Sequence, residues 1–342
     1  MRKKSIAKSL MASATCVVCL MSVSACGDLV PQPKEVAAST SAPSFTLAQA
    51  QRVESRLDAA IAASDAQRDP TPLAQYVDGP EYQIRASQLQ VLRATNQVNQ
   101  KMEIPTSDRQ VVLPLTTGWP RTVLVVTQAT QDQQSERLLV LSQASAHSNY
   151  MLWGLVRLFS GVTLPKFPVS SIGAKAGTLE DTGLVATPRQ ALMMYANVLQ
   201  NGSSSPYADK VASDQFRAQL QNLTDAVQQA VSANQGSQSQ VFTPDYQSAK
   251  IIRSADGGDF VVARIDSVWT RYAGPGRQSE PASTAEKALF GNATPTSTIK
   301  VTYVNVVALY IPPASNGSKI EAMGAERQPV QVIAVPDAQQ GK

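Results

Sequence analysis

The chain has 342 residues, of which 43% are hydrophobic and 16% are charged, a balance typical of globular proteins. Its net charge of +4 comes entirely from residues 1–25, which hold four basic residues and no acidic one, whereas the remainder carries 26 basic and 26 acidic residues. A neutral body excludes the strongly basic surface that nucleic-acid binding requires, so we expect no nucleic-acid partner.

Residues 1–25 have the layout of a secretory signal peptide. A basic head precedes a mostly apolar run from Leu10 to Val23, and the small residues Ser24 and Ala25 follow. The run has about 14 residues, fewer than the roughly 20 that a transmembrane helix needs. We therefore expect an exported protein without a permanent transmembrane helix in this segment.

Cys26 ends the motif Val23-Ser24-Ala25-Cys26, which resembles the lipobox of bacterial lipoproteins. The resemblance implies that the Cys26 thiol takes a diacylglyceryl group and that cleavage makes Cys26 the new N-terminus. Each buried CH₂ of an acyl chain such as palmitate contributes about 0.8 kcal/mol, and two chains anchor stably where one does not. We expect this lipid to hold the protein on the extracytoplasmic face of the cell membrane. The alternative is an ordinary cleaved signal followed by an unmodified cysteine.

The other two cysteines, Cys16 and Cys19, lie inside the apolar run and would be removed with it. The mature chain would then contain no internal disulfide, although it would face a compartment that permits disulfides. We therefore expect its stability to come from burial of apolar surface.

The first predicted folded region spans residues 45–170 and follows a disordered tether at 26–44, which is rich in Pro, Ala, Ser and Thr. A capping-box pattern at Thr46-Leu47-Ala48-Gln49 predicts a helix whose apolar stripe reaches Ile61. A second helix is predicted from about Glu81 to Ala94. Short runs rich in Val and Leu then predict four antiparallel strands at Gln110–Pro114, Trp119–Gln128, Arg137–Gln143 and Tyr150–Leu158.

The second predicted region spans residues 187–335 and repeats this order. Thr187-Pro188-Arg189-Gln190 is again a capping-box pattern, and Asn201-Gly202 is a natural stop. A longer helix is predicted from about Asp214 to Ala233. Strands are predicted at Gln240–Asp245, Ala249–Ser254, Asp259–Arg271, Ile299–Ile311 and within Lys319–Val335.

Turn residues mark the connections in the second region. Asp256-Gly257-Gly258 and Asn316-Gly317 predict two hairpin turns. Residues Ala273–Ser297 predict a long loop that is too polar for the core.

Two successive helix–helix–meander units predict an α+β fold with tandem domains at 45–170 and 187–335, a linker at 171–186 and a frayed tail at 336–342. A curved antiparallel sheet that holds two or three helices is the shape of the nuclear-transport-factor-2-like cone, so a tandem of such cones is our hypothesis. The alternative is one continuous α+β domain with a large sheet.

The sequence contains no cluster that identifies a catalytic or metal centre. His147 is the only histidine and lies in a predicted loop, whereas zinc needs clustered ligands, so we expect no metal. No glycine-rich phosphate-binding or dinucleotide motif occurs, so we expect no cofactor. Glu180-Asp181 is interpreted as part of a solvated loop, and Asp78 and Glu81 as acids that favour a helix start.

The most distinctive motif is Gly118-Trp119-Pro120-Arg121, which leads into a predicted strand. Pro120 fits the start of a strand, and Trp119 offers a large surface at the rim of the sheet. Arg121 is either a clamp for an anionic ligand or a solvated neighbour of a tryptophan that caps the core. Together with the lipobox, the two helices and the following hairpin, this motif resembles an uncharacterised family of actinobacterial lipoproteins and membrane-anchored proteins. The resemblance implies a location in the cell envelope and no particular activity.

We therefore expect a non-enzymatic lipoprotein of the bacterial cell envelope that binds a small ligand or an envelope protein partner. The residues expected to line a pocket are Trp119, Arg121, Trp153, Tyr195 and Trp269. One alternative is an enzyme with an acid or base inside a cone-like pocket, supplied by Asp259, Asp266 or His147. Another is a structural accessory subunit of an envelope complex.

Metabolic labelling with a clickable fatty acid tests the anchor. We expect the wild-type protein to be labelled and the Cys26→Ser variant to remain unlabelled, because a serine hydroxyl does not take the lipid at this step. Equal labelling of the two proteins would contradict the lipidation of Cys26.

Overall fold

The computed structural model describes residues 45–105, 107–116, 118–129 and 135–336. This part of the chain combines helices with antiparallel sheets, which confirms the predicted α+β class. The predicted signal peptide, the lipidation site at Cys26, the tether and all but the first residue of the tail lie outside the described residues. No helix within the described ranges has the length and hydropathy needed to span a bilayer.

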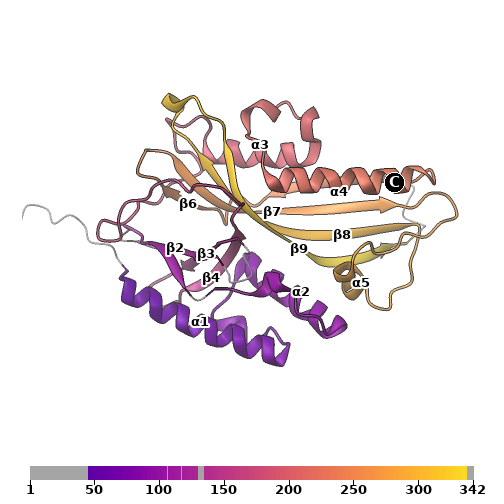
Figure 1. Ribbon diagram of the computed structural model, residues 1–342, viewed down its shortest axis with the longest axis horizontal. Helices are drawn as coiled ribbons and strands as arrows, with labels where there is room; N and C mark the ends of the chain where they lie inside the picture. The colour runs from indigo at the N-terminus through magenta and orange to yellow at the C-terminus, as the bar shows by residue number, and fades with distance from the viewer. Residues whose placement is uncertain (1–44, 106, 117, 130–134, 337–342) are drawn as a thin grey trace, which may run out of the picture. The chain divides into compact units, whose positions relative to one another are not determined.

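The first half contains two long helices and a four-stranded sheet (Figure 1). Helix α1 (Leu47–Gln67) begins at the predicted capping box, in which Thr46 Oγ1 accepts from Gln49 N (3.2 Å) and Gln49 Oε1 accepts from Thr46 N (2.8 Å). Helix α2 spans Gly79–Thr95. The antiparallel strands follow chain order: β1 (Asp108–Val112), β2 (Arg121–Thr127), β3 (Arg137–Gln143) and β4 (Met151–Arg157).

The second half contains helices α3 (Pro188–Asn201) and α4 (Gln215–Ser232) and a five-stranded antiparallel sheet. The strands are β5 (Ser237–Pro244), β6 (Lys250–Arg253), β7 (Asp259–Tyr272), β8 (Thr298–Ile311) and β9 (Glu321–Val335). Their order is β5-β7-β8-β9, with β6 also paired to β7. Both predicted hairpin turns are confirmed, because β6 pairs with β7 and β8 pairs with β9.

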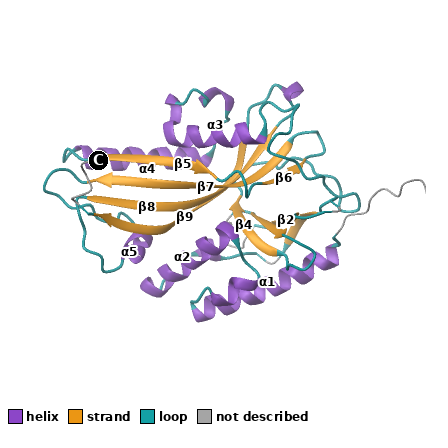
Figure 2. Cartoon of the chain, turned by 180° about the vertical axis from the view of Figure 1, so that it is seen from behind, coloured by secondary structure: helices purple, strands orange, loops and turns teal. Residues whose placement is uncertain are grey.

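The first sheet packs against one face of the second, with α2 beside it; α1 covers the outer face of the first sheet, and α3 and α4 cover the outer face of the second (Figure 2). One hydrophobic cluster contains Leu124 and Val140 of the first sheet together with Phe260 and Val306 of the second. A second cluster joins α1 and α2 to the first sheet, and a third joins α3 and the start of α4 to the second sheet. Ser87 Oγ of α2 donates to the Pro329 carbonyl oxygen of β9 (2.6 Å), so the layer against the second sheet contains α2 as well as the first sheet.

Two glycines allow the sheets to approach closely. A Cβ added at Gly324 of β9 would lie 2.5 Å from the Arg157 carbonyl oxygen, and one added at Gly154 of β4 would lie 3.3 Å from Val306. Beside this contact, Arg157 Nε donates to Glu326 Oε2 across the two sheets (2.6 Å). Packing and a charge-assisted hydrogen bond thus join β4 to β9.

The predicted linker, residues 171–186, contacts both sheets. Ala174 pairs with a residue that follows β1, and Ala176 pairs with Ile252 of β6. The described residues of the two halves fall in one compact unit. The division into tandem domains and the likeness of each half to a nuclear-transport-factor-2-like cone stay predictions.

The prediction of a polar loop over Ala273–Ser297 is wrong in part, because this segment contains helix α5 (Thr284–Phe290) and contributes to the core. Glu286 of α5 is 2% exposed. Its carboxylate accepts hydrogen bonds from Tyr303 Oη (2.7 Å) and Arg271 Nη2 (2.5 Å). These partners satisfy a carboxylate that burial alone would strongly destabilise.

Glu81 lies in the first turn of α2, as predicted, and it is buried, with 2% of its surface exposed. Burial raises the pKa of Glu81 to about 8; the Arg85 guanidinium opposes this rise, and the Glu326 carboxylate adds to it. In the folded chain Glu81 therefore keeps its proton up to a pH of about 8, whereas in the unfolded chain it loses the proton near its ordinary pKa of 4.5.

We expect the free energy of unfolding to fall as the pH rises from about 5 to 8, with the Glu81 contribution being at most about 1.4 kcal/mol per pH unit. In the Glu81→Gln variant, which mimics the protonated side chain, the free energy of unfolding should depend less on pH. Urea unfolding curves recorded at each pH measure this free energy. The Glu103→Gln variant changes an exposed glutamate and serves as the control. If the free energy of unfolding of Glu81→Gln fell with pH as steeply as that of the wild type, the pKa assigned to Glu81 would be contradicted.

Candidate functional site

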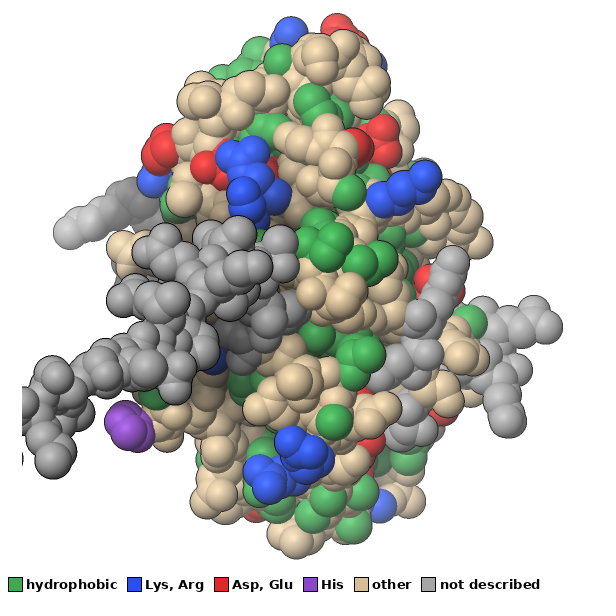
Figure 3. All heavy atoms as spheres, turned by 90° about the vertical axis from the view of Figure 1, so that its left-hand side faces the viewer, with side chains coloured by type: hydrophobic (Ala, Val, Ile, Leu, Met, Phe, Trp, Pro, Cys, Tyr) green, Lys and Arg blue, Asp and Glu red, His purple; other side chains and the backbone are tan. Residues whose placement is uncertain are grey.

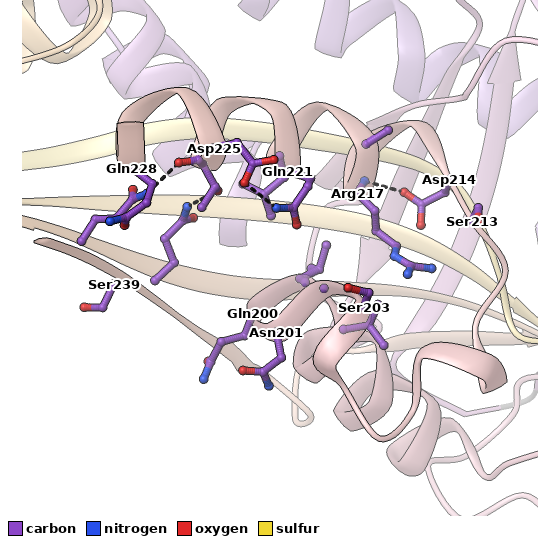
Figure 4. Close-up of a pocket in the computed structure, with 18 residues that line it drawn as sticks. Gln200, Asn201, Ser203, Ser213, Asp214, Arg217, Gln221, Asp225, Gln228 and Ser239 are labelled. Atoms are coloured by element: carbon purple, nitrogen blue, oxygen red, sulfur yellow. Dashed lines mark hydrogen bonds between the residues drawn. The ribbon is translucent and has the colours of Figure 1, made fainter. Parts of the chain in front are cut away.

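A groove of about 650 Å³ lies between the end of α3, one side of α4 and β5 (Figure 4). This volume is within the range of small-molecule sites. Ten of its 18 lining residues carry neutral amide or hydroxyl side chains. The six amides are Gln200, Asn201, Gln221, Gln228, Gln238 and Gln240. Because an amide group both donates and accepts, this lining suits a ligand with many hydroxyl groups.

Hydrogen bonds of α4 set the position of the groove walls. The helix begins at Asp214, whose Oδ1 accepts from Arg217 N (2.8 Å) as an N-cap. Farther along α4, the Thr224 carbonyl oxygen accepts from Gln238 Nε2 (2.6 Å) and Thr224 Oγ1 accepts from Gln240 Nε2 (2.9 Å). The side chains of β5 thus tie the strand to α4.

One buried acceptor atom among the described groove-lining residues remains free. Gln240 Oε1 has no hydrogen-bond partner among the residues that the structure describes, whereas the buried Asp214 carboxylate interacts with the Tyr195 hydroxyl. Burial raises the pKa of Asp214, against the hydrogen bond from Arg217 N. A buried acceptor without a donor costs about 1–3 kcal/mol, so a ligand that supplies O–H or N–H groups here would recover this free energy.

The charged side chains of the groove are engaged with neighbouring groups. Arg217 Nη1 donates to the Ala212 carbonyl oxygen (2.8 Å). Asp225 Oδ1 accepts from Gln221 Nε2 (2.8 Å). Together with Asp214, these are the charged residues of the lining, and the groove therefore favours an uncharged ligand over a strongly charged one.

A protein-family model described as a domain of unknown function matches residues 41–329 of the chain. The chain belongs to this family, DUF8094. The matched region contains α1 to α5 and every residue of the groove. No curated protein and no solved structure matches the chain.

Two of the predicted ligand residues lie behind the groove of this DUF8094 protein. Tyr195 of α3 is fully buried. Burial raises its pKa well above the ordinary value, and the nearby charge of Asp214 adds to the rise. Trp269 of β7 is 1% exposed, and its Nε1 donates to Gln238 Oε1 (2.8 Å). Both aromatic residues thus support groove-lining side chains without being among the lining residues themselves.

Of the other three predicted residues, Arg121 and Trp153 lie in strands of the first sheet and Trp119 lies just before β2. The Arg121 guanidinium carbon lies 4.3 Å from the ring centroid of Trp119, which is 43% exposed. Trp119 Nε1 donates to Gln143 Oε1 (3.2 Å). Trp153 is 4% exposed and lines a second cavity of about 440 Å³, together with Pro120. The structure therefore does not bring the five predicted residues into one site.

The acid–base candidate Asp259 is fully buried in β7. Burial raises its pKa to about 7; the Arg253 guanidinium opposes the rise and the Asp181 carboxylate adds to it. The interpretation of Asp181 as a solvated loop residue is wrong, because its Oδ2 accepts from Arg253 Nη2 (2.8 Å) and its side chain is 13% exposed. This cluster joins the 171–186 segment to β6 and β7.

The remaining acid–base candidates are more exposed. Asp266 forms an ion pair with Arg264 (2.7 Å), and His147 lies on the surface between β3 and β4. Neither these two residues nor Asp259 lines the groove or the second cavity. On the face shown in Figure 3, Lys and Arg side chains are dispersed among acidic and neutral ones. Within the described ranges, no group of three or more His, Cys, Asp or Glu residues could hold a metal ion.

Sequence reasoning missed the groove, although its composition carries a signal. The segment 214–240 contains eight glutamines, some along one side of a predicted helix and others at alternate positions of the following strand. Gln238 and Gln240 share a face because strand side chains alternate. What the sequence does not show is that α4 folds back over this strand.

Gly202 ends α3 at the wall of the groove and adopts φ 55° and ψ −130°, a conformation that suits glycine. A Cβ added here would lie 2.9 Å from Gln221 Oε1. We expect Gly202→Ala to lower the free energy of unfolding by about 1–3 kcal/mol, measured by urea denaturation. Gly118→Ala is the control, because its Cβ would meet no other described atom within 4 Å. Equal stability of the two variants would contradict this account of the α3 end.

Proposed function

We propose that this DUF8094 protein is a membrane-anchored extracytoplasmic lipoprotein that binds a neutral, hydroxyl-rich ligand, a short oligosaccharide, in the groove between α3, α4 and β5. The observation that carries the ligand class is the unpaired buried acceptor Gln240 Oε1 within a lining of amides and hydroxyls. A sugar hydroxyl donates to such an acceptor and accepts from neighbouring amide N–H groups.

The membrane anchor in this proposal is supported by the sequence of residues 1–26. A basic head, a short apolar run and a lipobox-like Cys26 favour export followed by lipidation. The folded unit would then face the envelope, where polysaccharides present many hydroxyl groups. An actinobacterial origin, as the Gly-Trp-Pro-Arg resemblance suggests, belongs to the same proposal.

A peptide bound as an added strand on β5 fits this groove less well. Strand addition needs free backbone N–H and C=O groups along an edge. The N–H of Phe242 in β5 already donates to Gln200 Oε1 of α3 (3.2 Å). The side chains of α3 and α4 thus occupy part of the edge that a peptide would use.

Calorimetry with the full chain in a sugar-free detergent tests the ligand class against a panel of soluble neutral oligosaccharides and extended peptides. We expect an oligosaccharide to bind and to change the fluorescence of Trp269, which contacts the groove through Gln238. The fluorescence change should be lost in Trp269→Phe while calorimetric binding remains. Binding of peptides alone, or of no probe, would contradict the proposal.

Two variants assign binding to the groove. Asp214→Asn keeps the helix cap but replaces the acceptor Oδ2 by a donor, and Gln240→Leu removes the free acceptor. Each should weaken oligosaccharide binding about tenfold, which corresponds to about 1.4 kcal/mol. Gln90→Leu makes the matched change on an exposed residue of α2 and should bind like the wild type. Unchanged affinity in both groove variants would place the sugar elsewhere.

A further inference from the structure

The second cavity, of about 440 Å³, lies where the first sheet meets β6 of the second. Its lining comes from the 3₁₀ turn at Thr71–Gln75, the start of α2, the ends of β2, β3 and β4, and Lys250 of β6. Backbone hydrogen bonds from Asp78 N to Leu152 O (3.1 Å) and from Leu152 N to Tyr76 O (2.7 Å) fix one wall to β4. In the described part of the chain, this cavity shares no lining residue with the groove.

A carboxylate on one wall of this cavity lacks a partner. Asp78 occupies the N-cap position of α2, but its side chain forms no cap hydrogen bond. An N-cap aspartate ordinarily accepts from the second or third helical N–H, and the second position here is Pro80, which has none. Asp78 Oδ1 is buried without a hydrogen-bond partner in the ranges described, and burial raises the pKa of Asp78.

An ammonium group lines the same cavity from the second sheet. Lys250 Nζ lies 5.2 Å from the ring centroid of Trp153, a distance suited to a cation–π contact. Within the described residues, neither Lys250 Nζ nor the Asp78 carboxylate forms a hydrogen bond or an ion pair of 4.0 Å or less. Burial lowers the pKa of Lys250, against the charges of Asp78 and Asp245.

We propose that this cavity is a second binding site, for a compact zwitterion that carries one ammonium and one carboxylate group, with free α-amino acids as its ligand class. The ammonium would pair with Asp78 and the carboxylate with Lys250. A simple anion would face Asp78 without compensation, and a simple cation would face Lys250. Pro120 and Met151 add apolar surface for the remainder of the ligand.

The Gly-Trp-Pro-Arg motif acquires a role in this site through its tryptophan. Gln143 Oε1 accepts from Trp119 Nε1 (3.2 Å), and Gln143 Nε2 donates to the Ser148 carbonyl oxygen (2.9 Å). Ser148 lines the cavity, as does Pro120 of the motif. Trp119 therefore positions the β3–β4 loop at the rim, although it is not itself a lining residue.

Gly79 allows the start of α2 to approach the aromatic side of the cavity. Its φ is +54°, and an added Cβ would lie 2.7 Å from Trp153 Cδ1. A larger residue here would be strained and would displace the indole. Asp78 and Trp153 can therefore lie on the same side of the cavity only because Gly79, which follows Asp78 and packs on the indole, has no side chain.

Calorimetry with the full chain in detergent, titrated with each of the twenty L-amino acids, tests the proposal. For any amino acid that binds, the N-acetyl derivative lacks the ammonium and the amide derivative lacks the carboxylate. We expect both blocked forms to bind at least tenfold more weakly than the free amino acid. Binding of none of the twenty, or equal binding of the blocked forms, would overturn the assignment.

Variants of the two charged residues assign that binding to the cavity. Asp78→Asn and Lys250→Met should each lower the affinity at least tenfold, and Asp78→Asn keeps the shape of the side chain. Asp209→Asn and Lys175→Met make the same changes at exposed positions and should bind like the wild type. Wild-type affinity in both cavity variants would refute this site. The result of the amino-acid titration is independent of the oligosaccharide test, because the two tests use different probes and different variants.

Discussion

The contact between the two sheets is the constraint on which the rest of the structure depends. Gly324 of β9 brings the strand so close to Arg157 of β4 that a side chain there would meet the backbone at 2.5 Å. The shared hydrophobic cluster and the Arg157–Glu326 hydrogen bond can form only at this separation. Asp78 and Lys250 line one cavity between the two halves, and α1, α3 and α4 cover the outer faces of the sheets.

Features that depend on neighbours in the chain could be predicted from the sequence. The capping boxes at Thr46 and Thr187 are present, as are both hairpin turns. The strands and the four long helices lie close to their predicted positions, although β5 begins at Ser237 rather than Gln240. Each of these features is decided by turn residues, caps or periodicity within a few positions, so tertiary contacts did not overrule them.

Features that depend on residues far apart in the chain could not be predicted. Glu286 looks like a solvated loop residue until Arg271 and Tyr303 are known to surround it. Asp78 precedes α2 and Lys250 begins β6, and no local pattern indicates that they line one cavity. The aromatic residues that were expected to line a pocket lie mostly in the core or behind the sites. A large apolar side chain stabilises the fold more when it is buried than when it is exposed.

Helix α4 is attached unevenly along its length, and this has a consequence for the groove. Its buried side chains, Phe216 and Leu220, belong to its first two turns, whereas Leu223 is 45% exposed. Farther along, Val227 packs against the cluster that contains Trp269, and side-chain hydrogen bonds at Thr224 link the helix to β5. Water or a bound molecule can replace such hydrogen bonds at little cost, while the apolar contacts of the first turns stay intact. The groove wall is therefore built mainly from side-chain hydrogen bonds on the β5 side of α4, whereas the apolar contacts of the helix lie on another side of it.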